Sequence, residues 1–228
     1  NALNLINWSL NEYAFGSEER LTNLNPLFFD NSIFDFYSSL FTGACLVPFS
    51  REDLKNPFKL VQQIKKKKCT SWFSVPSFLI YMQTMNVFKH DSLPDIKRFI
   101  FGGEGYVKSK LVKLYKLYGK QASLYNVYGP TECTCICSSY ELSDNDFEDL
   151  NGLTPLGSIA NNFDYIICDS NNNHVRADEI GELLLIGDNV GLGYYNDEAR
   201  SLESFVQNPL NYKYRQMAYK TGDLVRFC

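Results

Sequence analysis

The sequence has only two histidines, and no apolar run long enough to span a bilayer. Histidine occurs only at His90 and His174, with no candidate partner nearby in the sequence. Cys133, Cys135 and Cys137 alternate, which would put them on one face of a strand, whereas a zinc site usually needs a C-x₂-C-type pair with distant partners. A transmembrane helix needs about 20 apolar residues. The sequence therefore predicts neither a zinc protein nor a membrane-spanning one.

An excess of positive charge is also absent. The chain carries 22 Lys and Arg against 26 Asp and Glu, a net charge of −4. Its one basic cluster, residues 65–68, follows a predicted helix, and a helix C-terminus favours cations. Without a broad basic surface, neither nucleic acid nor a membrane is expected as a partner.

The seven cysteines are an odd number and are spread among apolar residues. This pattern favours reduced thiols in the cytoplasm over a disulfide framework. The chain begins at Asn1 and ends at Cys228, directly after a strand-like run, so we expect a piece of a longer polypeptide. Its 228 residues suffice for one large domain or two modest ones, and 45% apolar residues is typical of a globular protein.

Strand and helix patterns alternate along the first part of the chain. Residues 1–20 indicate a helix followed by a loop, and residues 28–29 a strand end that passes into a helix, which Asp30 or Ser32 would cap and Gly43 would end. Further strands are expected at residues 44–48, 71–75, 99–101 and 122–125, and further helices at residues 54–64, from residue 76 and at residues 111–118. The alternation predicts βαβ units and a parallel sheet flanked by helices.

Helical periodicity fades in the last third of the chain. Short strands are expected at residues 165–168, 181–186 and 224–227, with a turn at residues 171–173. We therefore predict an α/β fold with two subdomains. An α/β part would cover residues 1–145, and a smaller β-rich, distorted barrel-like part would cover residues 146–228.

The most informative segment, residues 126–134, reads Asn-Val-Tyr-Gly-Pro-Thr-Glu-Cys-Thr. Gly129 and Pro130 form a rigid turn, and Tyr128 offers a ring for stacking. Thr131 supplies a hydroxyl donor, and Glu132 a hard oxygen ligand for Mg²⁺. Right-handed crossovers would put this loop and residues 102–105 at the carboxyl ends of strands, where open α/β sheets bind ligands. The sequence therefore predicts a nucleotide site with its metal on one rim of the sheet.

Five motifs in this order resemble those of the adenylate-forming superfamily, which includes acyl-CoA synthetases, luciferases and amino-acid adenylation domains. They lie at residues 29–32, 102–104, 126–132, 181–183 with 191–195, and 219–223. Five ordered motifs are specific, whereas any one alone would be weak. Residues 28–48 are most similar to the amino-acid-activating branch, and residues 75–78 and 101–104 to its D-alanine–carrier-protein ligases.

The resemblance implies that one set of residues binds the nucleotide: Gly103, Glu104, Asn126, Tyr128, Gly129, Thr131 and Asp223. Tyr128 would stack on adenine, and Asp223, in a ribose-binding turn, would accept both ribose hydroxyls. Thr131 would donate to the α-phosphate and Glu132 would bind Mg²⁺, so these two would be the catalytic residues. Glu104 is equally well explained as a solvated turn residue.

A second set of residues would form the acceptor pocket. Asp30 would pair with the α-ammonium group of an amino acid, because a half-buried carboxylate is costly without a cation. The pocket walls would be Asn31, Phe34, Phe73, Ile100, Gly102, Val127, Cys135 and Ile136. By position alone, Asp30 is a helix cap, and the aromatic and aliphatic wall residues belong to the core. D-alanine ligases as a type carry cysteine where Gly102 stands, so we expect an enlarged or reshaped pocket.

The resemblance implies that a carboxylate and ATP react to an acyl-adenylate and pyrophosphate. The acyl group would then pass to a phosphopantetheine thiol on a carrier protein of the peptidyl or D-alanyl type. The superfamily's glycine-rich phosphate loop and its C-terminal catalytic lysine have no counterpart in this sequence. The chain would thus be the central part of such an enzyme, with weak or no turnover alone. Two alternatives stay open: a fragment of an acyl- or aryl-CoA ligase, and a non-catalytic nucleotide-binding module.

Overall fold

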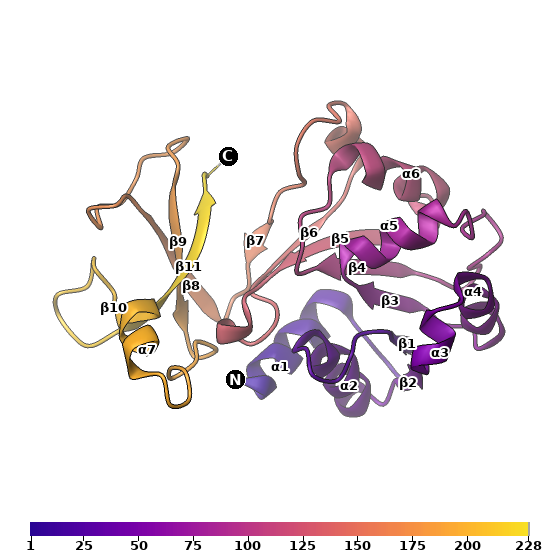
Figure 1. Cartoon of the computed structure of the whole chain (residues 1–228), viewed down its shortest axis with the longest axis horizontal. Helices are drawn as coiled ribbons and strands as arrows, with labels where there is room; N and C mark the ends of the chain where they lie inside the picture. The colour runs from indigo at the N-terminus through magenta and orange to yellow at the C-terminus, as the bar shows by residue number, and fades with distance from the viewer. Residues whose placement is uncertain (228) are drawn as a thin grey trace.

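A computed structural model describes residues 1–227 as two β-sheets with helices around the larger one (Figure 1). The larger sheet has seven strands in the order β2-β1-β3-β4-β5-β6-β7, and the smaller has four in the order β10-β11-β9-β8. Strands β1 to β5 pair in parallel, whereas every pair in the smaller sheet is antiparallel. The predicted fold class, a mostly parallel sheet flanked by helices and followed by a smaller β-rich part, is confirmed.

The strands of the larger sheet are β1 (Arg20–Asn23), β2 (Cys45–Pro48), β3 (Ser71–Ser74), β4 (Arg98–Gly102), β5 (Ser123–Tyr128), β6 (Ser138–Glu141) and β7 (Ser158–Ile159). Strand β1 was not expected from the sequence, and the strand end expected at residues 28–29 is wrong, because residues 26–29 form a turn. The reason is that β1 reads Arg-Leu-Thr-Asn and has Leu21 as its one apolar residue, so it lacks an apolar run.

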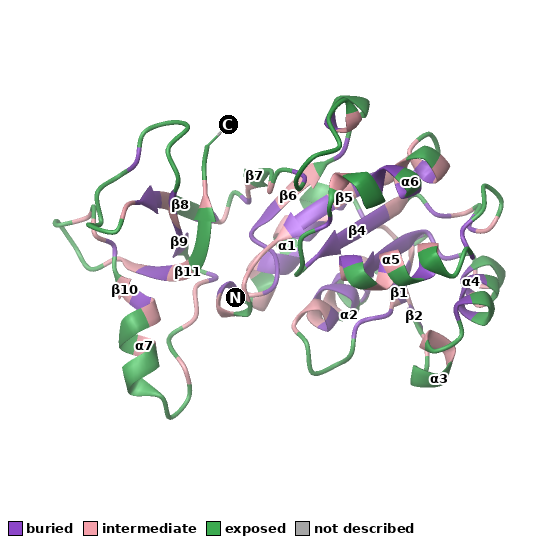
Figure 2. Ribbon diagram, turned by 45° about the horizontal axis from the view of Figure 1, so that its top comes forward, coloured by how far each residue is buried: buried purple, intermediate pink, exposed green. Residues whose placement is uncertain are grey.

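Helices cover both faces of the larger sheet: α1 (Ala2–Tyr13), α2 (Asn31–Thr42), α3 (Arg51–Leu54), α4 (Pro57–Lys66), α5 (Pro76–Thr84) and α6 (Lys108–Tyr118). Side chains of α4, α5 and α6 pack with Trp72 and Phe99 on one face. Side chains of α1 and α2 pack with Phe73 and Ile100 on the other. Neighbouring strand residues thus point to opposite faces, and buried residues concentrate between the layers (Figure 2). No helix within residues 1–227 has the length and apolarity to cross a membrane.

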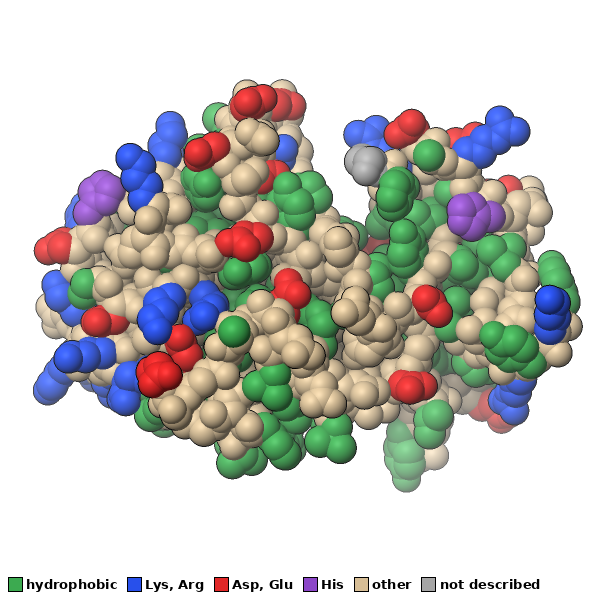
Figure 3. Space-filling view, turned by 180° about the vertical axis from the view of Figure 1, so that it is seen from behind, with side chains coloured by type: hydrophobic (Ala, Val, Ile, Leu, Met, Phe, Trp, Pro, Cys, Tyr) green, Lys and Arg blue, Asp and Glu red, His purple; other side chains and the backbone are tan. Residues whose placement is uncertain are grey.

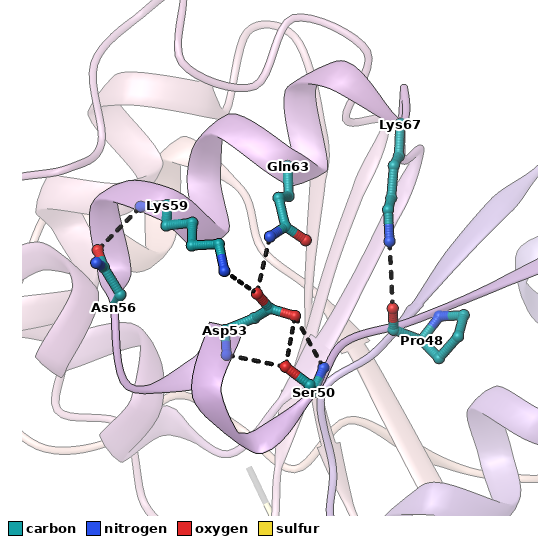
Figure 4. Close-up of polar contacts among 7 residues, drawn as sticks. All are labelled: Pro48, Ser50, Asp53, Asn56, Lys59, Gln63 and Lys67. Atoms are coloured by element: carbon teal, nitrogen blue, oxygen red, sulfur yellow. Dashed lines mark hydrogen bonds and ion pairs between the residues drawn. The ribbon is translucent and has the colours of Figure 1, made fainter.

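A sharp corner separates α3 from α4, where the sequence predicted one continuous helix (Figure 4). Asn56 caps α4 by accepting from the Lys59 amide at 3.1 Å, and Pro57 takes the first helical position. Asp53 holds the corner by accepting from Lys59 Nζ at 2.9 Å and from the Ser50 hydroxyl at 2.7 Å. The ammonium group of Lys59 and the bonds from Ser50 lower the pKa of this half-buried carboxyl.

The smaller sheet consists of β8 (Phe163–Cys168), β9 (Gly181–Gly187), β10 (Phe205–Gln207) and β11 (Met217–Val225), with α7 (Glu198–Ser204) beside it. The turn at residues 171–173 is present between β8 and β9. Residues 219–223 lie within β11, at an irregularity in its pairing with β9, and not in a separate turn as predicted. Strands β6 and β7 precede β8 in the chain and belong to the larger sheet. The division into subdomains at residues 145/146 stays a prediction.

The three alternating cysteines do not lie on a strand. Cys133 ends a short 3₁₀ helix, η1 (Thr131–Cys133), and the next residues Thr134 and Cys135 have φ angles of 66° and 74°. These left-handed residues turn the chain so that Cys133 and Cys137 pack on the smaller sheet while Cys135 packs under the larger one. Each of the six cysteines in the described part of the chain is a free thiol.

A buried carboxylate joins the amino ends of three strands of the larger sheet. Glu19 accepts from the Thr70 hydroxyl and from Lys97 Nζ at 2.9 Å. Arg98 Nη1 lies 3.2 Å from Glu19 Oε2, an ion pair without hydrogen-bond geometry. Burial raises the pKa of Glu19, but the bonds from Thr70 and Lys97 and the charge of Arg98 outweigh burial and lower the pKa below its usual value.

We expect Glu19→Gln to lower the free energy of unfolding by about 2–3 kcal/mol near neutral pH, because it leaves Lys97 and Arg98 without their buried counter-charge. A carboxyl with a lowered folded-state pKa contributes stability that is present above the unfolded pKa, about 4.3, and is lost as pH falls through the folded value. The difference from wild type should therefore shrink below about pH 4. Denaturant unfolding at several pH values measures this difference in the free energy of unfolding. Glu18→Gln, at an exposed neighbour, is the control, and equal losses in both variants would contradict the assignment.

Candidate active site

The two glycine-containing loops predicted to face a nucleotide are neighbours in the structure. Strands β4 and β5 pair in parallel up to Gly102 and Val127, so residues 103–105 and 129–131 both leave the carboxyl edge of the sheet. Strand β5 is longer than predicted and continues through Tyr128, so Asn126 and Val127 are strand residues and not loop residues. The sheet itself therefore fixes the distance between the two loops.

Close backbone approach explains two of the glycines. A Cβ on Gly102 would lie 2.3 Å from the carbonyl oxygen of Val127, and a Cβ on Gly129 would lie 2.3 Å from that of Cys135. Real Cβ atoms do not come so near another backbone. Val127 fills the space that a side chain on residue 102 would need, with its carbonyl oxygen 2.3 Å and its Cγ2 2.6 Å from the Cβ position. The expectation of an enlarged or reshaped acceptor pocket stays a prediction.

Two of the residues predicted to contact the nucleotide form hydrogen bonds to other residues of the protein with their side chains. Asn126 is buried and donates through Nδ2 to the carbonyl oxygen of Pro155 at 2.8 Å. Glu104 Oε2 accepts from the amide of Ser77 at 2.9 Å, in the first turn of α5, where a carboxylate also suits the helix dipole. Glu104 is thus more than a solvated turn residue. The exposed backbone of Gly103 and Glu104 is left as the part that can face a ligand.

A phenol–carboxylate bond joins the two sheets. The Tyr128 hydroxyl, at the end of β5, donates to Asp223 Oδ2 of β11 at 2.5 Å. Burial and the neighbouring Asp223 both raise the pKa of Tyr128, so the phenol keeps its proton and acts as the donor. The surface between the two lobes is hollowed (Figure 3). Tyr128 and Asp223, predicted to hold adenine and ribose, are therefore brought together across the two sheets.

Glu132 lies in η1 between the sheets. Its Oε1 accepts from the Tyr194 hydroxyl at 2.5 Å, and its carbonyl oxygen accepts from the Gly191 amide at 2.7 Å. Its other carboxylate oxygen accepts no hydrogen bond within residues 1–227, although Glu132 lies near enough to the Tyr219 hydroxyl to help raise the Tyr219 pKa. Thr131 beside Glu132 is exposed. The described residues contain no group of three or more metal-ligating side chains. One free carboxylate oxygen fits Mg²⁺ that takes its remaining ligands from phosphate and water.

The predicted wall residues of the acceptor pocket come together in one buried cluster: Phe34, Phe73, Ile100, Val127, Cys135 and Ile136. The rings of Phe34 and Phe73 meet edge to face at 4.9 Å. Cys135 Sγ lies 3.8 Å from Asn31 Oδ1, and burial, followed by the charge of Asp30, raises the pKa of the Cys135 thiol. The cluster therefore lies directly beside Asp30 and Asn31, at the start of α2.

Asp30 occupies the N-cap position of α2 but does not cap the helix with its side chain. Its φ and ψ angles are −61° and −26°, and its carboxylate makes no cap hydrogen bond. No hydrogen bond or ion pair of this half-buried carboxylate occurs within residues 1–227. The helix-cap interpretation of Asp30 is thus wrong, and the carboxylate is available for another group.

Two features of the site were not predicted. Tyr194 contacts Glu132, although the sequence marked residues 191–195 only as a structural motif. Asp35 of α2 is buried, and burial raises the pKa of its carboxyl. The hydrogen bonds from Asn25 and Asn23 lower this pKa but do not outweigh burial. No local pattern marks either contact, because their partners come from other elements.

The chain is similar to a known enzyme family and to curated proteins. The family profile described as "AMP-binding enzyme" matches residues 1–195 of the chain. A D-alanine--D-alanyl carrier protein ligase of Bacillus velezensis is 29% identical over 98% of this chain and 43% of its own length. The protein of the same name from Listeria monocytogenes serotype 4b is 32% identical over 98% of this chain and 42% of its own.

Solved structures have the same fold. CmiS6 superposes with a TM-score of 0.87 at 24% identity, covering 96% of this chain and 52% of its own. Holo-PA1221, an NRPS protein containing adenylation and PCP domains, superposes with a TM-score of 0.82 at 27% identity, over 93% of this chain and 36% of its own. The chain spans less than half the length of the curated relatives it matches. Because the profile covers residues 1–195 of 228, the chain belongs to the AMP-binding enzyme family.

Proposed function

We propose that the complete polypeptide containing this chain activates an amino acid with ATP and passes it to a phosphopantetheine thiol on a carrier protein. The observation that carries this proposal is the meeting of Tyr128, Glu132 and Asp223 between the two sheets, beside the Gly102–Glu104 loop. The names of the relatives, which include a D-alanyl carrier protein, support the partner class. Six free thiols in the described part support a reducing, cytoplasmic location.

Each side chain would contribute by binding or orienting a reactant. The ring of the half-buried Tyr128 would stack on adenine, and Asp223 would accept from the ribose hydroxyls. Thr131 would donate to the α-phosphate while Glu132 holds Mg²⁺, which offsets phosphate charge when bound. The amino-acid carboxylate would form a bond to the α-phosphorus as the bond to pyrophosphate breaks. The carrier thiol would then take the acyl group, and AMP would leave.

Asp30 gives the best indication of the substrate class. Its carboxylate has no protein partner in residues 1–227 and lies next to the buried cluster around Phe34 and Phe73. A carboxylate in such a place favours a substrate that brings a cation, because an unpaired charge near apolar groups is costly. An α-ammonium group next to a carboxylate that reacts is the defining feature of an amino acid. This arrangement supports amino acids over fatty or aryl acids.

We expect Asp30→Ala in the complete polypeptide to reduce amino-acid-dependent pyrophosphate exchange by about 100-fold, since a charge-assisted contact contributes up to about 3 kcal/mol. ATP binding, measured separately by calorimetry, should stay unchanged. Asp164→Asn, at an exposed position on β8, should behave as wild type. Undiminished exchange in the Asp30 variant would exclude the ammonium contact, and exchange driven by fatty or aryl acids alone would favour an acyl- or aryl-CoA ligase.

A second observation concerns the complete polypeptide. The solvent-exposed face of α2 is apolar. The helix buries Ser32, Asp35, Ser38 and Ser39 with Phe34, and exposes Phe36, Leu40 and Phe41. The loop before it also exposes Leu27, Phe28 and Phe29, by 77%, 83% and 58%. Hydrophobic side chains gather along the lower edge of the molecule in Figure 3, the edge where α2 lies in Figure 1. We call these six exposed side chains the outer face of α2.

An exposed apolar patch of this kind marks a surface that another part of a protein covers. The matched relatives are more than twice as long as the region they share with this chain. We therefore propose that a segment of the same complete polypeptide packs on the outer face of α2.

The double variant Leu40→Gln/Phe41→Gln should lower the unfolding free energy of the complete polypeptide by about 3 kcal/mol, because two side chains would lose their burial. Thermal or denaturant unfolding measures the loss. Leu202→Gln, exposed on α7 of the other lobe, is the control and should be neutral. If the double variant is as stable as wild type, the outer face stays in solvent and the packing proposal is wrong.

A further inference from the structure

Tyr194 connects the smaller sheet to the predicted metal ligand. It lies in the loop between β9 and α7, 62 residues from Glu132 along the chain, and its hydroxyl donates to Glu132 Oε1 at 2.5 Å. The Tyr219 hydroxyl of β11 lies 3.5 Å from that of Tyr194. The second oxygen of Glu132 accepts no hydrogen bond within residues 1–227, and the Tyr219 hydroxyl lies near the same carboxylate, which helps raise the Tyr219 pKa. One side of the carboxylate is therefore fixed and the other side is open.

The ring of Tyr194 is itself held on several sides. The guanidinium carbon of Arg200 lies 4.1 Å above its centroid, and Phe205 meets it edge to face at 5.5 Å. Its backbone amide donates to the Ser201 hydroxyl at 2.7 Å. A phenol whose ring is already fixed gains little conformational entropy when its hydrogen bond breaks. It can therefore hold a carboxylate in one orientation.

The backbone beside Glu132 is fixed independently. Its carbonyl oxygen accepts from the Gly191 amide at 2.7 Å, and a Cβ on Gly191 would lie only 3.1 Å from that oxygen. The loop that carries Tyr194 thus lies directly against η1. Backbone contact sets the position of Glu132, while the phenol sets the rotation of its carboxylate.

We propose that Tyr194 is a positioning residue that orients the Glu132 carboxylate for Mg²⁺ in the nucleotide complex. This rests on the proposed function, which makes Glu132 the metal ligand. A hydrogen bond to one oxygen of a ligating carboxylate aims the other oxygen at the metal, and losing such a bond typically weakens metal binding about 10- to 100-fold. Tyr194 does not contact the metal itself.

The test uses Mn²⁺ with ATP as the probe for the metal site of the complete polypeptide. Electron paramagnetic resonance of free Mn²⁺ gives the dissociation constant directly and does not depend on turnover. Tyr194→Phe removes one oxygen atom and keeps the ring, so we expect about 10-fold weaker Mn²⁺ binding. Metal-free AMP affinity and the melting temperature should stay unchanged. Tyr195→Phe is the matched control, because the adjacent Tyr195 is 94% exposed.

Glu132→Gln separates this proposal from the assignment on which it rests. If Glu132→Gln weakens Mn²⁺ binding while Tyr194→Phe binds it as wild type does, the positioning role is overturned and the metal ligand stands. If Glu132→Gln binds Mn²⁺ as wild type does, the metal assignment falls and the positioning role falls with it. If Tyr194→Phe fails to fold, Arg200→Gln keeps the hydroxyl but frees the ring; a several-fold loss supports the proposal, and wild-type affinity overturns it.

Discussion

Two phenol–carboxylate hydrogen bonds cross between the sheets, and the arrangement of the site depends on them. Tyr128 of the larger sheet donates to Asp223 of the smaller one, and Tyr194 of the smaller part donates back to Glu132 of the larger. Both oxygen–oxygen distances are 2.5 Å. Because the bonds run in opposite directions, each part of the protein supplies one donor and one carboxylate. The site therefore exists only when the two parts meet.

The same bonds explain why the protein tolerates exposed or half-buried carboxylates between its lobes. Without a ligand, a carboxylate near apolar surface is costly unless a donor satisfies it. Tyr128 and Tyr194 satisfy one oxygen each of Asp223 and Glu132 and leave the other free. Asp30 differs, since it has neither a cap bond nor an ion pair. Of the three carboxylates, it is the one that would gain most from a cation on the proposed substrate.

Local patterns predicted strands β2 to β5 and the helices around them, because short apolar runs near glycine or proline carry their own signal, whereas β6 and β7 were not predicted. Strand β1 lacks such a run, and the break between α3 and α4 depends on the cap at Asn56 and not on periodicity. The order of the motifs identified Tyr128, Glu132 and Asp223 as candidate site residues. It did not predict their hydrogen-bond partners. Tyr128 and Asp223 are 95 residues apart, and no local pattern says which phenol meets which carboxylate.

Ligand binding need not separate the two lobes. Ribose hydroxyls that donate to Asp223 would compete with Tyr128 for one of its oxygens. Other contacts between the lobes avoid the site carboxylates: the Gly191 amide donates to the backbone of Glu132 at 2.7 Å, and the Thr134 hydroxyl donates to the carbonyl of Asn189 at 3.0 Å. Cys133 and Cys137 also pack into the core of the smaller sheet. These contacts would keep the smaller sheet in place if Asp223 exchanged the Tyr128 hydroxyl for a ribose hydroxyl, so the proposed nucleotide site could change hydrogen-bond partners without a movement of the lobes.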